Sequence, residues 1–213
     1  LTCVEASRDE VDEVIQGYKA IGVDHIVALR GDPPGDVRAT WTAHPEGLTY
    51  ASELVELIAR RGGFEIGVAA FPDVHPESAD LDADVETLVR KAEAGASFAV
   101  TQMVFDPETY LALRDRVNAR VDLPITAGIM PITNLKQIRR MSELMGTPIP
   151  AATVERLHAV EGDPAAVRAE GIAIAIEMCQ RLLDEGVPGL HFITMNRSTA
   201  TLEVHGALGL GDR

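Results

Sequence analysis

Arg30 and Asp32 are the most informative polar residues of the chain, because they stand directly behind the apolar run 25–29. The prolines and glycines at 31–35 end any helix or strand at that point. Charged groups on loops that follow a buried strand are typical of active sites. Further polar groups take the same position behind later apolar runs: Asp73, His75, Glu77, Asn196 and Arg197.

Gln102 is a different kind of candidate, because its amide lies inside the apolar run 97–105. A buried amide must be hydrogen-bonded or it lowers stability. Its partner is either a neighbouring strand or a polar ligand.

Each of the other candidates also has a plain structural explanation. Arg30 and Asp32 could form a structural ion pair, and His75 between prolines could only shape its loop. Arg90 and Lys91 lie in a helical pattern, where they are either a solvated face or a pair of phosphate-binding cations. The histidines lack metal-ligand spacing and no nucleophile motif is present, so no metal is expected.

The elements that must position these groups alternate between short apolar strands and helices of period about 3.6. We expect strands over 1–4, 25–30, 64–71, 97–105, 124–130 and 189–195. We expect helices from Ser7, over 52–61, 82–94, 107–119, 134–145, 148–160 and 165–185, and weakly over 201–208.

This alternation predicts an α/β fold with a parallel sheet. A doubly wound sheet is less favoured, because no glycine-rich phosphate turn follows the first strand. A (β/α)8 TIM barrel accounts better for polar residues behind strand after strand. We count about six βα units, so we expect one catalytic barrel domain over 1–213 whose N-terminal two units are absent.

Composition limits the functions that this chain can have. With 19 basic and 33 acidic residues the formal charge is −14, which argues against nucleic acid or anionic membranes as partners. Local cations can still bind small anionic ligands. Cys3 and Cys179 read as reduced thiols, so we expect a cytoplasmic protein.

Six segments together resemble the methylenetetrahydrofolate reductase family: 28–34, 71–77, 91–96, 101–106, 128–132 and 191–197. Each segment alone is modest evidence. All six in the same order, across essentially the whole chain, are specific.

The resemblance implies a (β/α)8 barrel that binds FAD non-covalently. It implies that NADH or NADPH reduces the flavin, which then reduces 5,10-methylenetetrahydrofolate to 5-methyltetrahydrofolate for methionine supply. It further implies a folate substrate and a homo-oligomer.

The same resemblance assigns roles to residues of this sequence. Asp32 and Gln102 are the catalytic candidates, with Asp32 near the flavin pyrimidine and Gln102 binding nicotinamide and pterin in turn. The implied FAD-binding residues are Arg30, Gly31, Asp32, Ala51, Phe71, His75, Asp84, Arg90 and Lys91. The implied substrate-binding residues are Asp32, Tyr50, Gln102 and Arg197.

The sequence also departs from the family pattern. Phe71 and Ile193 stand where a tyrosine is common, and Leu135 stands where some members carry a stacking aromatic residue. The Phe-Glu-Phe-Phe-Pro-Pro segment, whose glutamate is the family's general acid, is not in these 213 residues. We therefore expect them to be inactive by themselves, and the alternative function is an FAD- or folate-binding barrel without catalysis.

Overall fold

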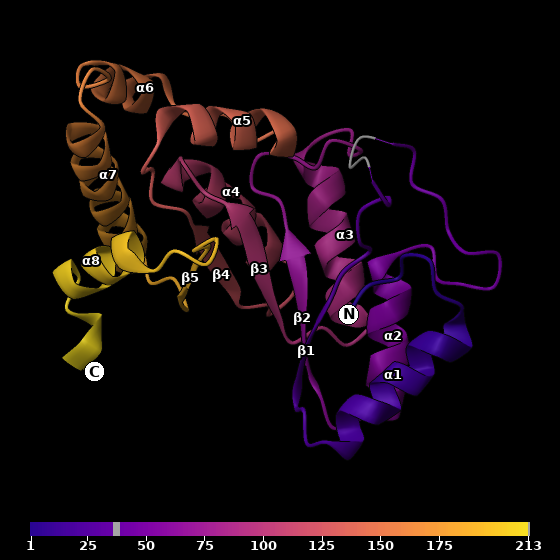
Figure 1. The fold of residues 1–213 in the computed structure, drawn as a ribbon. Coiled ribbons are helices and arrows are strands. Elements are labelled where there is room, and N and C mark those ends of the chain that lie inside the picture. Colours follow the sequence, from indigo (N-terminus) through magenta and orange to yellow (C-terminus); the bar gives the residue numbers. More distant parts are fainter. Residues whose placement is uncertain (36–38, 213) are drawn as a thin grey trace. The chain divides into compact units, whose positions relative to one another are not determined.

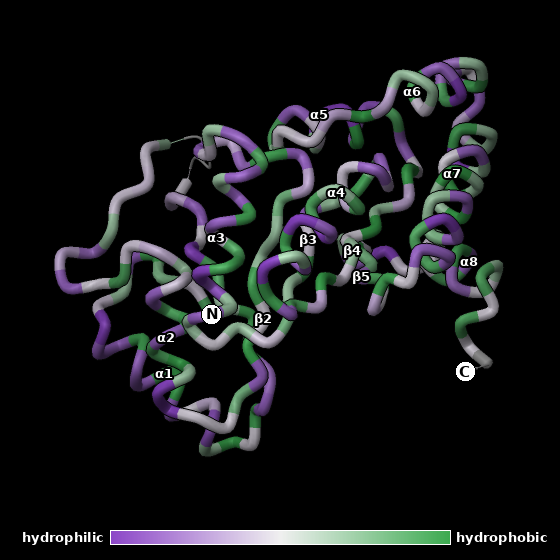
Figure 2. The backbone as a smooth tube through the Cα atoms, turned by 180° about the vertical axis from the view of Figure 1, so that it is seen from behind, coloured by the Kyte–Doolittle hydropathy of each residue, from purple (hydrophilic) through white to green (hydrophobic). Residues whose placement is uncertain are grey.

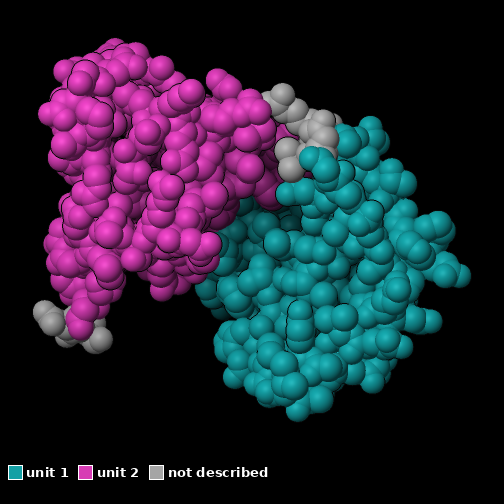
Figure 3. Space-filling view, viewed as in Figure 1, with its two compact units in different colours: residues 1–70, 82–100, 116–124 teal, residues 71–81, 101–115, 125–213 magenta. Residues whose placement is uncertain are grey.

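The structure is a computed structural model that describes residues 1–35 and 39–212. Its contacts group into two compact units, shown in teal and magenta in Figure 3. Unit 1 comprises residues 1–70, 82–100 and 116–124, and unit 2 comprises 71–81, 101–115 and 125–213. Each unit is described by itself below, and the expectation of a single domain stays a prediction.

The sheet has the order β1-β2-β3-β4-β5, so that strands adjacent in sequence are adjacent in the sheet (Figure 1). The strands are β1 (His25–Ala28), β2 (Glu65–Ala70), β3 (Phe98–Met103), β4 (Ile125–Ile129) and β5 (Leu190–Phe192). The pairs β1–β2 and β4–β5 are parallel. Helices separate the strands along the chain, and the predicted α/β class is confirmed.

The helices follow the predicted pattern closely. They are α1 (Arg8–Ala20), α2 (Ala51–Arg61), α3 (Leu81–Glu93), α4 (Pro107–Asn118), α5 (Leu135–Met145), α6 (Ala151–His158), α7 (Pro164–Asp184) and α8 (Thr199–Ala207), followed by a 3₁₀ turn η1 (Leu210–Asp212). Along α7, hydrophilic and hydrophobic residues alternate in Figure 2, as expected for a helix with one buried side.

The predicted first strand at 1–4 is wrong as an extended element. Only a single isolated parallel bridge, between Thr2 and Leu29, joins this segment to the residues after β1. Two backbone hydrogen bonds flank the bridge, from Leu29 N to Leu1 O (3.0 Å) and from Cys3 N to Arg30 O (3.1 Å). The structure therefore has five strands in its described residues instead of six.

In unit 1, α2 packs against β1 and β2, and α1 packs against α2. Ser7 caps α1 and forms a capping box with Glu10, as predicted. Ile15, Leu54 and Val68 are fully buried.

In unit 2, one apolar cluster joins the end of β3, the residues after β4 and the inner side of α5. Its buried members are Met103, Phe105, Met130, Ile132, Leu135, Ile138, Leu157 and Val167. Asn134 caps α5, its side chain accepting from Gln137 N. Gly171 of α7 lies so close to this segment that an added Cβ would be 1.7 Å from Ile132 O. The residues after β4 are therefore held between α5 and α7.

Candidate functional site

The loop after β1 holds three of the predicted residues in a fixed conformation. Gly31 has φ +86°, and a Cβ there would lie 3.0 Å from the Thr2 Cβ, so only glycine fits without strain. The Arg30 guanidinium carbon lies 5.2 Å from the ring centroid of Trp41, a cation–π distance. Asp32 is exposed and is presented to solvent beside this anchored arginine.

The first turn of α2 places Tyr50 and Ala51. The Glu53 carboxylate accepts from Thr49 N (2.7 Å) and Tyr50 N (2.8 Å), which fixes the chain where it enters the helix. Tyr50 is 61% exposed, whereas Ala51 is buried. Tyr50 therefore offers an aromatic ring to a ligand, while Ala51 can contribute no more than backbone and a methyl group.

A buried lysine is the main electrostatic feature of unit 1. Lys91 is only 8% exposed and donates from Nζ to Ala69 O at 3.0 Å, at the end of β2. Burial lowers the pKa of the Lys91 ammonium to about 8. The buried Asp84 opposes this change, and the positive charges of Arg30 and Arg90 add to it.

Three predicted residues of unit 1 lie close enough to Lys91 to change its pKa: Arg30, Asp84 and Arg90. With Lys91 they comprise three cations and one carboxylate. Arg90 is oriented by its own helix, because its Nη2 donates to Thr87 Oγ1 at 2.9 Å. A group of this kind suits phosphate oxygens.

In unit 2, the segment after β2 carries Phe71 and His75. Their rings meet edge to face, with centroids 4.6 Å apart. His75 Nδ1 accepts from Glu77 N at 3.1 Å. The imidazole is thus oriented by both the aromatic ring and its own loop.

Asp73, in the same segment, is a titratable group whose environment the sequence does not reveal. Burial raises the pKa of its carboxyl to about 6, the Thr109 hydroxyl lowers it, and the Asp106 carboxylate raises it further. The sequence shows that Asp73 follows a strand and lies between two apolar residues. It does not show that the start of α4 packs next to Asp73 and helps to bury it.

Gln102 is satisfied within unit 2. Its Oε1 accepts from Met103 N at 2.9 Å, and its Nε2 lies 3.6 Å from Met145 Sδ. The neighbouring Thr101 bonds β4 instead, its hydroxyl accepting from Gly128 N at 2.8 Å. Gln102 therefore has hydrogen-bond partners, but they are the backbone of the next residue and a methionine of α5, and not the neighbouring strand that the sequence suggested. Sulfur is a weak partner that a ligand can replace.

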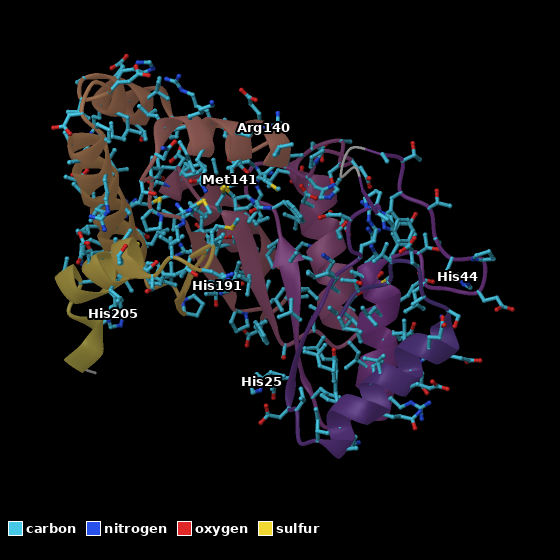
Figure 4. The ribbon with its side chains drawn as sticks, in the orientation of Figure 1. His25, His44, Arg140, Met141, His191 and His205 are labelled. Carbon is cyan, nitrogen blue, oxygen red and sulfur yellow. The ribbon has the colours of Figure 1, made fainter. Side chains whose placement is uncertain are left out.

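Arg197 lines a cavity of about 270 Å³ in unit 2. The lining comes from the residues after β4, the first turns of α5, the residues after β5, α7 and the start of α8. Figure 4 labels Met141, which lines the cavity, and its neighbour Arg140, which is exposed. Sequence reasoning missed one cavity residue of interest, Arg168, because it lies in the middle of the α7 helical pattern.

The predicted residues are divided between the two units. Those of unit 1 are Arg30, Gly31, Asp32, Tyr50, Ala51, Asp84, Arg90 and Lys91, and those of unit 2 are Phe71, His75, Gln102 and Arg197. Across residues 1–35 and 39–212, no group of three or more histidine, cysteine, aspartate or glutamate side chains has the arrangement of a metal site. Within the same ranges, no helix is long and apolar enough to cross a bilayer.

Comparison with known proteins decides the family. A family model for methylenetetrahydrofolate reductase matches residues 1–209. The chain belongs to this family.

Relatives of known name support the same assignment. A 5,10-methylenetetrahydrofolate reductase from Escherichia coli (strain K12) is 40% identical over 212 residues, which is 99% of this chain and 69% of that protein. Methylenetetrahydrofolate reductase 2 from Saccharomyces cerevisiae is 38% identical over 210 residues, covering 96% of this chain and 35% of that protein. The resemblance read from the sequence is therefore confirmed.

A solved structure also resembles the fold of this member of the methylenetetrahydrofolate reductase family. An uncharacterized protein from Clostridium thermocellum, which binds two copies of 5-methyl-5,6,7,8-tetrahydrofolic acid, aligns with a TM-score of 0.64 at 16% identity. The alignment covers 99% of this chain and 71% of that chain. Together with the parallel sheet and alternating helices, it supports the TIM-barrel fold class.

Proposed function

We propose that this chain carries the reducing site of a methylenetetrahydrofolate reductase, which converts 5,10-methylenetetrahydrofolate to 5-methyltetrahydrofolate with NADH or NADPH as electron donor. The observation that supports it is the match to the family over residues 1–209, with 40% identity to the E. coli enzyme across nearly the whole chain. Bound FAD supplies the hydride relay between the two substrates.

The cation group of unit 1 supports the flavin part of the proposal. Lys91 and Arg90 hold the FAD phosphates, and Arg30 adds a third positive charge from the loop after β1. Asp84 accepts from hydroxyl groups of the ribityl or ribose portion. In a chain of net charge −14, these three cations are a local group of positive charge.

Asp32 and Gln102 are the residues that we propose act on the substrates. Asp32 is exposed and can accept from the N–H groups of the pterin, and its charge influences the potential of a nearby flavin. Gln102 has both a donor and an acceptor, so that one amide can serve nicotinamide and pterin in turn. Phe71 and His75 contribute flavin contacts, and Tyr50 and Arg197 contribute folate contacts.

Purification of the protein with added FAD tests the proposal. We expect a yellow protein whose flavin absorbance is bleached by NADH or NADPH. In a protein that also contains the family's general-acid segment, 5,10-methylenetetrahydrofolate restores the absorbance and 5-methyltetrahydrofolate is the product, whereas residues 1–213 alone are expected to lack this second step. Gln102→Leu is expected to slow both half-reactions by about 10- to 100-fold, because each loses a hydrogen bond to its substrate.

Two results would decide against this function. A protein that cannot be loaded with FAD would contradict the flavin part. A protein that binds FAD and folate but catalyses no reduction would instead be the binding module considered above as the alternative.

A further inference from the structure

The side-chain amide of Gln102 is held at both of its ends by groups of unit 2. Its Oε1 accepts from Met103 N at 2.9 Å, and its Nε2 donates to Met145 Sδ at 3.6 Å. A backbone N–H can only donate a hydrogen bond, and a thioether sulfur can only accept one. Both partners therefore require the same orientation of the amide, with its oxygen at the backbone of β3 and its nitrogen at α5.

These two contacts use half of what the amide can offer. The nitrogen has a second N–H and the oxygen has a second lone pair. A nicotinamide carboxamide and a pterin ring each carry a donor next to an acceptor, so that either can pair with this half of the amide. Gln102 is partly exposed, whereas Thr101 and Met103 on either side of it are buried. Its side chain is therefore on the more accessible face of β3.

Met145 is fixed by the end of its own helix. It is the last residue of α5, and Gly146, with φ +68°, ends the helix by donating from N to Ser142 O. Ser142 Oγ donates to Thr147 O at 2.5 Å, and Thr147 is only 2% exposed. The Met145 side chain also packs against the apolar cluster of unit 2. The helix end and this packing therefore place the sulfur.

We propose that Met145 is the positioning residue for Gln102, whose amide it holds in the orientation that pairs first with the nicotinamide and then with the pterin. This inference rests on the proposed function and adds the residue that prepares Gln102 for both substrates. A side chain that is ordered before its ligand arrives loses less conformational entropy on binding. The contact is also weak, because sulfur is a poor acceptor, so that the amide can adjust to two ligands of different shape.

A first measurement needs neither FAD nor substrate. Isotopic labelling of the glutamine side-chain nitrogens makes the Gln102 amide visible by nuclear magnetic resonance, and the signal that disappears in Gln102→Leu identifies it. We expect a lower order parameter for this amide in Met145→Leu than in the unaltered protein, because leucine keeps the apolar packing but has no acceptor. An unchanged order parameter would overturn the proposal.

A second measurement is the affinity for two ligands that cannot react. One is the oxidised nicotinamide dinucleotide, added to the protein with oxidised FAD. The other is 5-methyltetrahydrofolate, added to the protein with reduced FAD. We expect Met145→Leu to bind both ligands about two- to tenfold more weakly, because the Gln102 side chain must then be ordered during binding.

Two further variants separate the acceptor from the packing. Met145→Gln supplies an acceptor oxygen on a side chain of similar length, and we expect it to restore both affinities to within about twofold of the unaltered protein. Met178→Leu, the same substitution at a side chain of α7 that is 8% exposed, is the matched control and is expected to leave both affinities unchanged. If Met145→Gln binds as weakly as Met145→Leu, the acceptor is not what matters and the proposal is wrong.

The Gln102→Leu background separates positioning from a general change in α5. In this background Met145→Leu is expected to have no further effect on either affinity, because the side chain that it positions is gone. If Met145→Leu weakens binding equally in both backgrounds, Met145 acts through the packing of α5, which contradicts the proposal.

The failure of this inference and the failure of the proposed function give different results. If the unaltered protein binds both ligands and Met145→Leu binds them equally well, this inference fails and the proposed function stands. If the unaltered protein with FAD binds neither ligand, the proposed function fails and this inference fails with it.

Discussion

At the scale of single residues, Lys91 shows how burial turns an ordinary lysine into a group that titrates near neutrality. Its pKa of about 8 results from burial, and Arg30 and Arg90 lower it further. A ligand that brings phosphate oxygens would stabilise the charged form. Binding and protonation of this lysine are therefore linked.

We expect FAD affinity to fall as pH rises above 8, by up to tenfold per pH unit, because the neutral amine must take up a proton before it can pair with phosphate. Fluorescence titration of FAD at several pH values between about 7 and 9.5 measures this. Lys91→Met is expected to bind FAD at least about tenfold more weakly at pH 7 and to lose this pH dependence.

Lys136→Met, which removes an exposed lysine on α5, serves as the control for loss of one positive charge. An unchanged pH profile in Lys91→Met would show that another group titrates.

The lowered pKa of Lys91 also predicts how the stability of the protein without FAD depends on pH. The free energy of unfolding should rise between pH 8 and 10.5, since the unfolded chain keeps the lysine proton over that range and the folded chain does not.

Residue types alone indicated that Gln102 needs a partner, and the structure bears this out. Arg168 could not be found in the same way. An arginine within a helix is usually a solvated side chain, and the cavity next to Arg168 is built from residues that lie 25 or more positions away in the chain. Local pattern carries no information on such distant contacts.

At the scale of elements, two helical glycines predict opposite outcomes for the same substitution. Gly17 of α1 has nothing within 4 Å of an added Cβ, whereas at Gly171 of α7 the Cβ would be 1.7 Å from Ile132 O. An alanine at position 17 therefore raises the helix propensity of α1 without a clash. At position 171 the added methyl group would meet backbone that cannot move at low cost.

Gly17→Ala is expected to stabilise the protein by about 0.5–1 kcal/mol. Gly171→Ala is expected to destabilise it by about 2 kcal/mol or more, because α7 must move away from the residues after β4. Urea denaturation of the two variants measures both changes. Equal effects of the two substitutions would mean that α7 does not pack as described.

Helix boundaries were predictable where a side chain or a glycine marks them. Ser7 caps α1, Asn134 at the start of the predicted range 134–145 caps α5, and α2 ends at Gly62. Strand lengths were less predictable. Residues 1–4 are apolar enough for a strand but make a single bridge, and β5 covers Leu190–Phe192 instead of 189–195. An apolar run shows that a segment is buried, not how many ladder hydrogen bonds it makes.

At the scale of the whole molecule, the net charge of −14 repels anionic ligands. At about 10 mM salt the Debye length is roughly 30 Å, so that a distant FAD senses the net negative charge of the whole chain before the few local cations outweigh it. The positive charges of Arg30, Arg90 and Lys91 attract the ligand only at short range.

We therefore expect the association rate of FAD to increase a few-fold between about 10 mM and 150 mM salt, because salt screens the repulsion. Stopped-flow measurement of flavin binding gives this rate directly. A rate that falls with added salt would show that the cations of unit 1 already steer the ligand from a distance.

The alternation of apolar runs and helices was sufficient to predict the α/β class, because strand and helix periods differ clearly. The grouping of site residues was only partly accessible. Sequence order predicts that polar groups follow strand ends, but the proximity of Arg30, Asp84, Arg90 and Lys91 depends on how deeply α3 buries its lysine. That depth is a property of packing in three dimensions.

The stacking of Arg30 on Trp41 has a practical consequence. The chain has a single tryptophan, and its ring lies 5.2 Å from the charged group of the loop that we propose meets the cofactor. Indole emission responds to nearby charge, so that this one chromophore acts as an intrinsic optical reporter. Occupation of the loop can therefore be followed without attaching any label to the molecule.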